Sequence, residues 1–126
     1  MRIPSIFLGV LALAACQSSP LAPASTLFNE EMAKFKAQPF GDSAFQEYAK
    51  VWMQFNNENS LDEKDDCYSK ASGQVRLVIL VDETGTVRNV ATDIENAKAT
   101  CFKESYMNVR FPPPPFPSFR QALNMQ

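Results

Sequence analysis

Few side chains in this chain of 126 residues are suited to covalent or acid–base chemistry. There are three cysteines, Cys16, Cys67 and Cys101, and no histidine. The absence of histidine removes the commonest general acid/base and the commonest zinc ligand. A serine nucleophile would need a lysine or carboxylate as its base, and no serine lies in a nucleophile-elbow motif. We therefore expect no catalytic residues, no metal site and no cofactor, and we look to the cysteines.

The amino terminus has the pattern of an export signal. One positive charge, Arg2, precedes an uncharged apolar run over residues 6–15. This run is shorter than the roughly 20 residues that span a bilayer, but it suits the core of a signal peptide. Residues 1–15 are therefore predicted to be a signal peptide.

The apolar run ends in Leu13, Ala14, Ala15 and Cys16. These residues resemble the lipobox of bacterial lipoproteins, in which a leucine and two small residues precede the cysteine that receives a diacylglyceryl group. The resemblance implies cleavage between Ala15 and Cys16, a lipid on Cys16, and a membrane-anchored protein facing the periplasm. By analogy with lipoprotein sorting, Gln17 in place of aspartate favours the outer membrane over the inner one. The alternative is an ordinary secretory signal with an incidental cysteine.

Lipidation of Cys16 would leave two cysteines as a pair. Cys67 and Cys101 would then lie in an oxidising compartment, where disulfides persist. A bridge between them closes a loop of about 35 residues and is worth roughly 4 kcal/mol on the chain-entropy account. A Cys67–Cys101 disulfide is therefore predicted, and two free buried thiols are the alternative.

Length and charge limit the number of domains and the class of partner that the chain can have. A chain of 126 residues has room for one domain. The formal net charge of −2 becomes −3 once Arg2 leaves with the signal peptide. Without a basic patch, neither nucleic acid nor anionic lipid is expected as the main partner. Residues 16–25, rich in Ser, Pro and Ala, are predicted to be a lipidated tether, and residues 26–126 a single domain.

Two helices are predicted at the start of this domain. Thr26 is expected to cap a short helix that ends before Pro39, and Ser43 with Gln46 forms a capping-box pattern for a second helix. In the second helix, apolar residues recur at spacings of three and four: Phe45, Tyr48, Ala49, Trp52 and Phe55. Core packing is the expected role of this aromatic stripe, with a ligand groove as the alternative. Residues 56–66 are predicted to be an acidic loop, which lacks the glycine and terminal glutamate of a calcium loop.

A β-hairpin is predicted next. Residues 73–82 are rich in β-branched residues and apolar on both faces, Gly85 lies in a turn that needs a positive φ, and residues 86–93 form the second strand. A helix is predicted over residues 97–109, then a stiff proline-rich connector over 111–117, for which a polyproline ligand is the alternative. The fold class is therefore α+β: N-terminal helices, then a hairpin, a helix and a short closing strand in a small antiparallel sheet.

This order of elements resembles the C-terminal domain shared by TonB and TolA proteins. The likeness is carried by Gly73 and Val75, by the hairpin residues 81–87 and by the helix end at 109–113, within about 55 of the 126 residues. The cysteine pair, one before the first strand and one inside the helix, is most similar to the third domain of TolA. The inner-membrane helix and the long periplasm-crossing region of that family are missing from this sequence, so no energy transduction is expected.

The resemblance implies a protein-interaction module in the cell envelope, whose partners are envelope proteins and whose contact with the membrane is its lipid. TonB-type domains leave a sheet edge free, to which an extended partner segment can add a strand. The predicted edge is the closing strand, and the alternative is that the N-terminal helices cover it. This strand comprises Phe119, Arg120, Gln121, Ala122, Leu123, Asn124 and Met125.

Two other functions fit parts of the sequence. A piloting or assembly lipoprotein for an outer-membrane secretin or secretion machine would also carry a lipid anchor, and it would expose part of the aromatic stripe. An envelope hydrolase is the third hypothesis. The missing histidine and the clustering of carboxylates in one loop argue against it.

Overall fold

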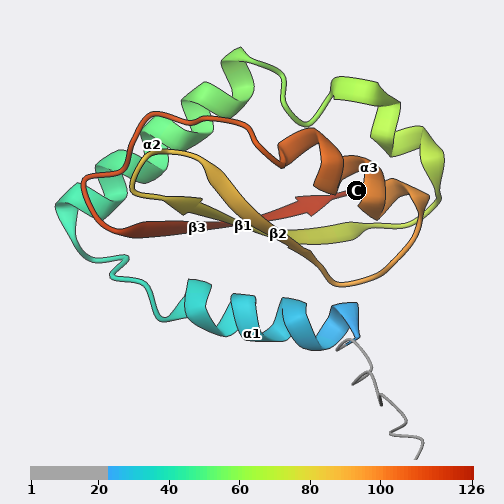
Figure 1. The fold of residues 1–126 in the computed structure, drawn as a ribbon, viewed down its shortest axis with the longest axis horizontal. Coiled ribbons are helices and arrows are strands. Elements are labelled where there is room, and N and C mark those ends of the chain that lie inside the picture. Colours follow the sequence, from blue (N-terminus) through green and yellow to red (C-terminus); the bar gives the residue numbers. More distant parts are fainter. Residues whose placement is uncertain (1–22) are drawn as a thin grey trace, which may run out of the picture.

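The computed structural model describes residues 23–126 (Figure 1). The predicted signal peptide, the cleavage site at Ala15 and Cys16, and tether residues 16–22 lie outside the described residues. The described chain forms four helices and three strands: α1 (Ala24–Lys36), α2 (Ser43–Glu58), the 3₁₀ helix η1 (Lys64–Lys70), β1 (Val75–Asp82), β2 (Val87–Thr92), α3 (Ala97–Tyr106) and β3 (Ser118–Met125). Over residues 23–126, no helix has both the length and the apolar character needed to cross a membrane.

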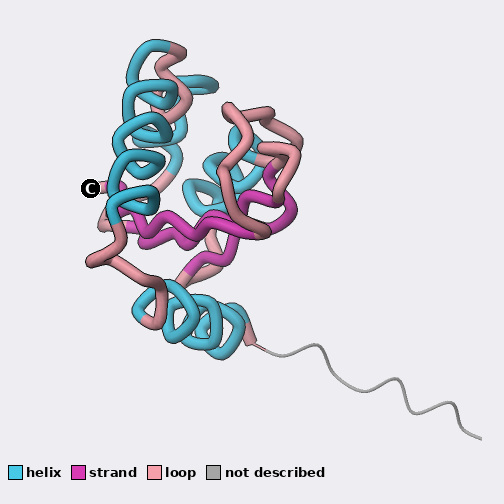
Figure 2. Tube along the Cα trace, turned by 90° about the vertical axis from the view of Figure 1, so that its left-hand side faces the viewer, coloured by secondary structure: helices cyan, strands magenta, loops and turns pink. Residues whose placement is uncertain are grey.

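The three strands form one antiparallel sheet in the order β2-β1-β3. In this register, Val78 of β1 pairs with Ala91 on one side and with Ala122 on the other. Helix α1 covers one face of the sheet, while α2 and α3 cover the opposite face (Figures 1 and 2). The fold is therefore α+β with a small antiparallel sheet, as the sequence predicted.

The main core lies between the sheet and the helices α2 and α3. Leu77 and Ile79 of β1 are fully buried there, together with Trp52 of α2 and Tyr106 of α3. Trp52 stacks on Phe111, with the ring centroids 4.7 Å apart. Offset and stacked aromatic pairs of this kind add to the gain from burying apolar area. The prolines after Phe111 thus follow a residue that belongs to the core.

The aromatic stripe of α2 faces this core, as predicted. Phe45, Tyr48 and Trp52 are buried, and Ala49 and Phe55 are partly buried against the same cluster. The piloting hypothesis expects part of this stripe to be exposed. Trp52 is 0% exposed, which counts against that expectation at this residue, whereas Phe55 is partly buried.

The second face of the sheet packs against α1. Phe28 is 2% exposed and contacts Val78 and Ala91, with Met32 and Phe35 extending the contact along the helix. These residues recur at helical spacing, so α1 turns one apolar face to the sheet. This explains why residues on both faces of β1 are buried.

Helix α1 begins earlier than predicted. Ala24 and Ser25, assigned to the tether, are its first two residues. Thr26 is therefore not the cap: it lies in the first turn, where its N–H donates to the carbonyl of Pro23 at 3.0 Å. Pro23 has φ −56°, close to a helical value, and a residue with this fixed φ suits a helix start.

Helix α2 begins one residue earlier than predicted, at Ser43, and has a different cap. The carboxylate of Asp42, not the hydroxyl of Ser43, accepts a hydrogen bond from the N–H of Phe45 at 3.1 Å. The Gln46 side chain does not complete a capping box, because its Nε2 donates to the carbonyl of Phe40 at 2.8 Å. Aspartate and serine are comparable caps, so the sequence alone did not separate them.

Two segments after α2 also depart from the prediction. Residues 56–66 are not one loop: α2 continues through Glu58, and η1 begins at Lys64. Asn56 is 4% exposed and its Oδ1 accepts a hydrogen bond from the Tyr106 hydroxyl at 2.6 Å, which allows an amide to be buried. Helix α3 ends at Tyr106 rather than at 109, because Asn108 has φ +66°, a conformation that asparagine tolerates and that ends helices.

The hairpin turn has the predicted glycine at its tightest point. Gly85 has φ +85°, and the carboxylate of Asp82 accepts hydrogen bonds from the side chain and N–H of Thr84. The hydrogen bond from the Thr84 side chain is the main reason why the pKa of Asp82 lies well below its ordinary value, and Arg88 lowers it further. The turn therefore holds an ionised carboxylate at the end of β1.

The predicted disulfide is present. Cys67 of η1 and Cys101 of α3 are bonded, with their Cα atoms 5.4 Å apart. Cys67 is 0% exposed and Cys101 is 8% exposed. The bridge joins η1 to α3 and so fixes the helix that borders β2.

Candidate functional site

A three-stranded sheet has two edge strands, and the structure treats its two edges differently. In an antiparallel pair, alternate residues of an edge strand direct their N–H and C=O groups toward the neighbouring strand, and the residues between them direct theirs outward. Unpaired outward groups are the positions at which another strand can add. The outward groups of β3 and of β2 are therefore the candidate binding positions.

In the first part of the predicted edge, β3, the outward backbone groups are already hydrogen-bonded to another part of the chain. The side-chain amide of Gln38 donates to the carbonyl of Arg120 at 2.9 Å and accepts from its N–H at 2.7 Å. The backbone of Arg120 therefore faces outward and is fully paired. The alternation then places the backbone groups of Ala122 and Asn124 on the same outward side.

The rest of β3 is partly open. The carbonyl of Ala122 accepts a hydrogen bond from the Gln121 side chain at 3.1 Å, whereas within residues 23–126 the outward backbone groups of Asn124 have no hydrogen bond in the structure. Phe119 and Met125 are buried, and Leu123 packs against the main core. Of the predicted edge, residues 119–125, the carboxyl-terminal end is thus the part whose outward backbone groups stay open to a partner.

An ion pair reinforces the covered part of β3. The Arg120 guanidinium donates to Glu31 of α1 at 2.7 Å. Burial opposes the ionisation of Glu31, but the hydrogen bonds and charges of Arg120 and Lys34 together outweigh it and hold the pKa of Glu31 below its ordinary value. Helix α1 is therefore attached to β3 both through Gln38, just after the helix, and through this pair.

Strand β2 is the edge that the sequence analysis did not consider. The Asp93 N–H donates to the carbonyl of Arg76 at 3.1 Å, and Ala91 pairs with Val78 of β1. By alternation, Val90 and Thr92 direct their N–H and C=O groups outward. Within the part of the chain that the structure describes, these groups form no backbone or side-chain hydrogen bond.

The beginning of β2 is closed by the segment that follows α3. The Val87 N–H donates to the carbonyl of Val109 at 3.0 Å, and the Phe111 N–H donates to the carbonyl of Gly85 at 2.7 Å. Thr86 and Arg110 form an isolated bridge at the same place. The open part of this edge therefore begins after Val87 and is only a few residues long.

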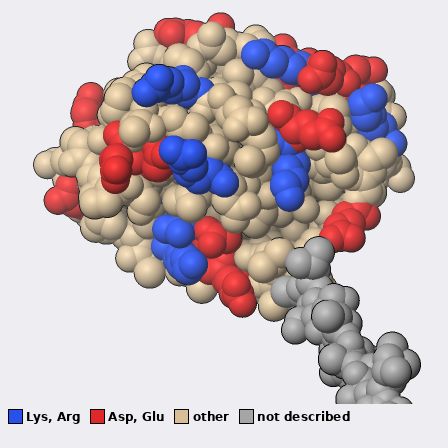
Figure 3. Space-filling view, viewed as in Figure 1, with Lys and Arg blue, Asp and Glu red and all other residues tan. Residues whose placement is uncertain are grey.

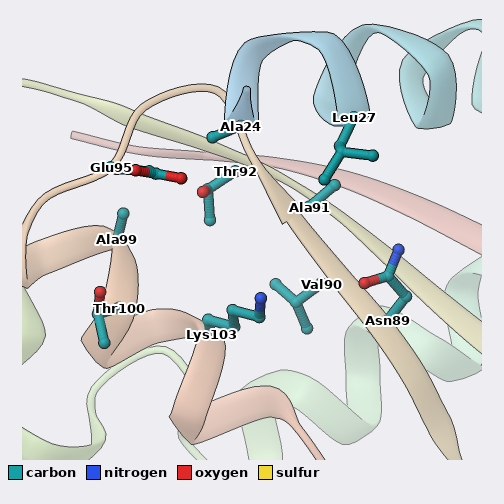
Figure 4. A pocket seen from close by; sticks show the side chains of 10 residues that line it. All are labelled: Ala24, Leu27, Asn89, Val90, Ala91, Thr92, Glu95, Ala99, Thr100 and Lys103. Atoms are coloured by element: carbon teal, nitrogen blue, oxygen red, sulfur yellow. The ribbon is translucent and has the colours of Figure 1, made fainter. Parts of the chain in front are cut away.

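A groove of about 270 Å³ runs along the open part of β2. We call it the β2-edge groove. Ala24 and Leu27 of α1 form one wall, and Ala99, Thr100 and Lys103 of α3 form the other, with residues 89–92 between them and Glu95 at one end (Figure 4). It is the gap between the two helical layers at the place where a fourth strand would continue the sheet.

Apolar surface and charge are both available at the groove. Leu27 is 47% exposed, although it lies beside the buried Ala91. On the face shown in Figure 3, basic and acidic side chains are interspersed. A partner would therefore be recognised by shape, backbone pairing and a few local charges.

The described residues contain no cluster of three or more His, Cys, Asp or Glu side chains placed to hold a metal ion. The acidic segment 56–66 contributes to ordinary polar contacts instead, such as the hydrogen bond from the Tyr68 hydroxyl to Asp62. The sheet edges are therefore the sites that the geometry distinguishes.

Comparisons with known proteins add no relative: no family model matches the chain, and neither curated proteins nor solved structures yield a match.

Proposed function

We propose that the chain is an envelope lipoprotein whose folded domain binds a protein partner by strand addition at the β2-edge groove. One observation carries this proposal: the outward backbone groups of Val90 and Thr92 have no partner among the described residues, and a groove lies directly beside them. Backbone groups of this kind supply affinity in strand addition, and the side chains beside them supply selectivity.

The contrast between the two edges supports β2. Exposed edges invite association, and proteins cover those that are not used. Here Gln38 pairs the outward backbone of Arg120 on β3, and Val109 pairs that of Val87 at the start of β2. Among the described residues, a short open stretch remains on β2, between two helices that would hold an added strand, and the open end of β3 at Asn124 is tested as its control below.

The proposed anchor is a lipid on Cys16, with the domain facing the periplasm from the outer membrane. Residues 17–22 would connect the lipid to α1, and at about 3.5 Å per residue they reach roughly 20 Å. Ala24 at the start of α1 lines the groove. A partner bound there would consequently lie close to the membrane, which suits a role in envelope assembly or attachment. The proposal includes no energy transduction.

The strand-addition proposal is tested with proline at outward positions. Thr92→Pro removes an N–H that the native sheet does not use, which edge strands tolerate. The matched control is Asn124→Pro, which removes an outward N–H from β3. Partners recovered with the full chain from cross-linked cell envelopes should be lost with Thr92→Pro and kept with Asn124→Pro. Loss with Asn124→Pro alone would assign binding to β3 and reject the proposal.

The anchor is tested separately. Mass spectrometry of the chain purified from cell envelopes should show an amino-terminal Cys16 that carries a diacylglyceryl group, and Cys16→Ser should abolish both the lipid and the membrane association. An unmodified amino terminus in the membrane-associated protein would reject the lipoprotein assignment without affecting the test of the groove.

A further inference from the structure

The two ends of the β2-edge groove carry opposite charges. Glu95 follows β2 at the Thr92 end, whereas Lys103 of α3 points toward Val90 (Figure 4). Neither side chain forms an ion pair within residues 23–126. Both charges are therefore available to groups that enter the groove.

An added strand would present its side chains to the two walls in alternation. Val90 pairs with Ile79 and lies on the α3 face of the sheet, whereas Ala91 pairs with Val78 on the α1 face. Because side chains directly opposite each other share a face, partner residues opposite Val90 and Thr92 point toward α3. The partner residue opposite Ala91 points toward α1.

The wall at each of these positions differs in chemistry. On the α1 side, Ala24, Leu27 and Ala91 offer an apolar surface. On the α3 side, the position opposite Val90 lies near the Lys103 ammonium, and the position opposite Thr92 lies near the Glu95 carboxylate. Complementary charges across an interface set the orientation and selectivity of a ligand more than they raise its affinity.

We propose that the partner of the β2-edge groove is a short extended segment that pairs antiparallel to β2 and carries, from its amino to its carboxyl end, a basic, an apolar and an acidic residue in succession. The acidic side chain lies over Lys103, the apolar one against Leu27, and the basic one beside Glu95. This inference rests on the strand-addition function proposed above. It adds the chemistry by which the partner is selected, and the pairing of Val87 with Val109 limits the segment to a few residues.

The test uses two synthetic peptides and the full ¹⁵N-labelled chain in detergent micelles. One peptide, Thr-Thr-Lys-Val-Glu-Thr-Thr, has the proposed pattern. The other, Thr-Thr-Lys-Val-Lys-Thr-Thr, has no acid to meet Lys103. The first should slow hydrogen exchange at the Val90 and Thr92 amides and bind about fivefold more tightly than the second, as expected for an exposed ion pair.

Charge reversal in the protein completes the test. Lys103→Glu should reverse the preference, so that the two-lysine peptide binds more tightly. The control Lys50→Glu changes an exposed lysine of α2 outside the groove and should leave the preference unchanged. Equal binding of both peptides, or the same preference in Lys103→Glu, would overturn the charge assignment while leaving strand addition intact. If neither peptide binds, the charge assignment is also overturned, whereas strand addition itself is decided by the Thr92→Pro experiment.

Discussion

The side-chain amide of Gln38 forms two hydrogen bonds with the backbone of Arg120, one to the carbonyl at 2.9 Å and one from the N–H at 2.7 Å. It occupies both outward groups of one β3 residue, as a neighbouring strand would. One side chain thereby closes the first part of β3, the predicted edge, whereas among the described residues the outward backbone groups of Val90 and Thr92 on β2 and of Asn124 at the end of β3 stay open.

Gln38→Ala should lower the free energy of unfolding by about 1–2 kcal/mol, because two hydrogen bonds between the α1–α2 connection and β3 are lost. Hydrogen exchange at the Arg120 amide should accelerate in the same variant. The matched control is Gln54→Ala, which removes an exposed hydrogen bond to Glu58 within α2 and should change stability by less than about 0.5 kcal/mol. Equal effects of the two substitutions would contradict the role of Gln38.

Gly85→Ala should destabilise the protein more than Gly73→Ala, although both glycines have nearly the same φ, +85° and +86°. A Cβ at Gly85 would lie 1.9 Å from the carbonyl oxygen of Phe111, whereas one at Gly73 meets nothing within 4 Å. Gly73→Ala should therefore lower the free energy of unfolding by about 1–2 kcal/mol, because alanine is strained in the left-handed conformation. Gly85→Ala should lower it by at least about 1 kcal/mol more, because of the added steric clash. Urea unfolding measures both, and equal losses would show that the turn does not contact the 109–111 segment.

Replacing both bridge cysteines, Cys67→Ser with Cys101→Ser, should lower the free energy of unfolding by about 4 kcal/mol on the chain-entropy account. The bridge closes a loop with a sequence separation of 34 residues. Denaturant unfolding of the variant and of the reduced protein should give similar losses. A variant as stable as the oxidised protein would mean that the η1–α3 contact does not depend on the bridge.

Stability should fall at alkaline pH. Burial raises the pKa of Tyr48 from 10.0 to about 12, and burial also raises the pKa of Tyr106. Above pH 10 the unfolded chain releases these protons before the folded one, so the unfolded state binds fewer protons and stability declines as pH rises. The decline attributable to Tyr48 approaches about 1 kcal/mol per pH unit.

Tyr48→Phe checks this assignment. It removes the hydrogen bond from the Tyr48 hydroxyl to the carbonyl of Pro112, so it should cost about 1 kcal/mol at neutral pH and make the alkaline decline shallower. Urea unfolding at several pH values between 8 and 11 gives the slope. An unchanged slope in Tyr48→Phe would show that Tyr48 does not contribute to it.

Much of the fold was predictable because its signals are local. The β-branched run of β1, the positive φ at Gly85 and the aromatic period of α2 each depend on neighbouring residues only. The Cys67–Cys101 pair followed from counting cysteines. The end of α3 was missed although Asn108 is a known helix-ending type, because the apolar pattern continued to Val109.

The open edge could not be predicted in the same way. Whether β2 or β3 is free depends on contacts between residues far apart in the chain, such as Gln38 with Arg120 and Val87 with Val109. Neither contact has a sequence pattern. The groove beside Val90 likewise arises from the separation of α1 and α3, which is a property of the packed layers.

Strand addition at β2 is tested most directly by photo-cross-linking in cells that produce the full chain, with a photoreactive amino acid at Leu27 on the wall of the β2-edge groove. We expect a protein adduct at this position that disappears when Thr92→Pro is introduced. An adduct from a probe at Asn124 on β3 with none at Leu27, or a Leu27 adduct that persists in Thr92→Pro, would contradict strand addition at β2.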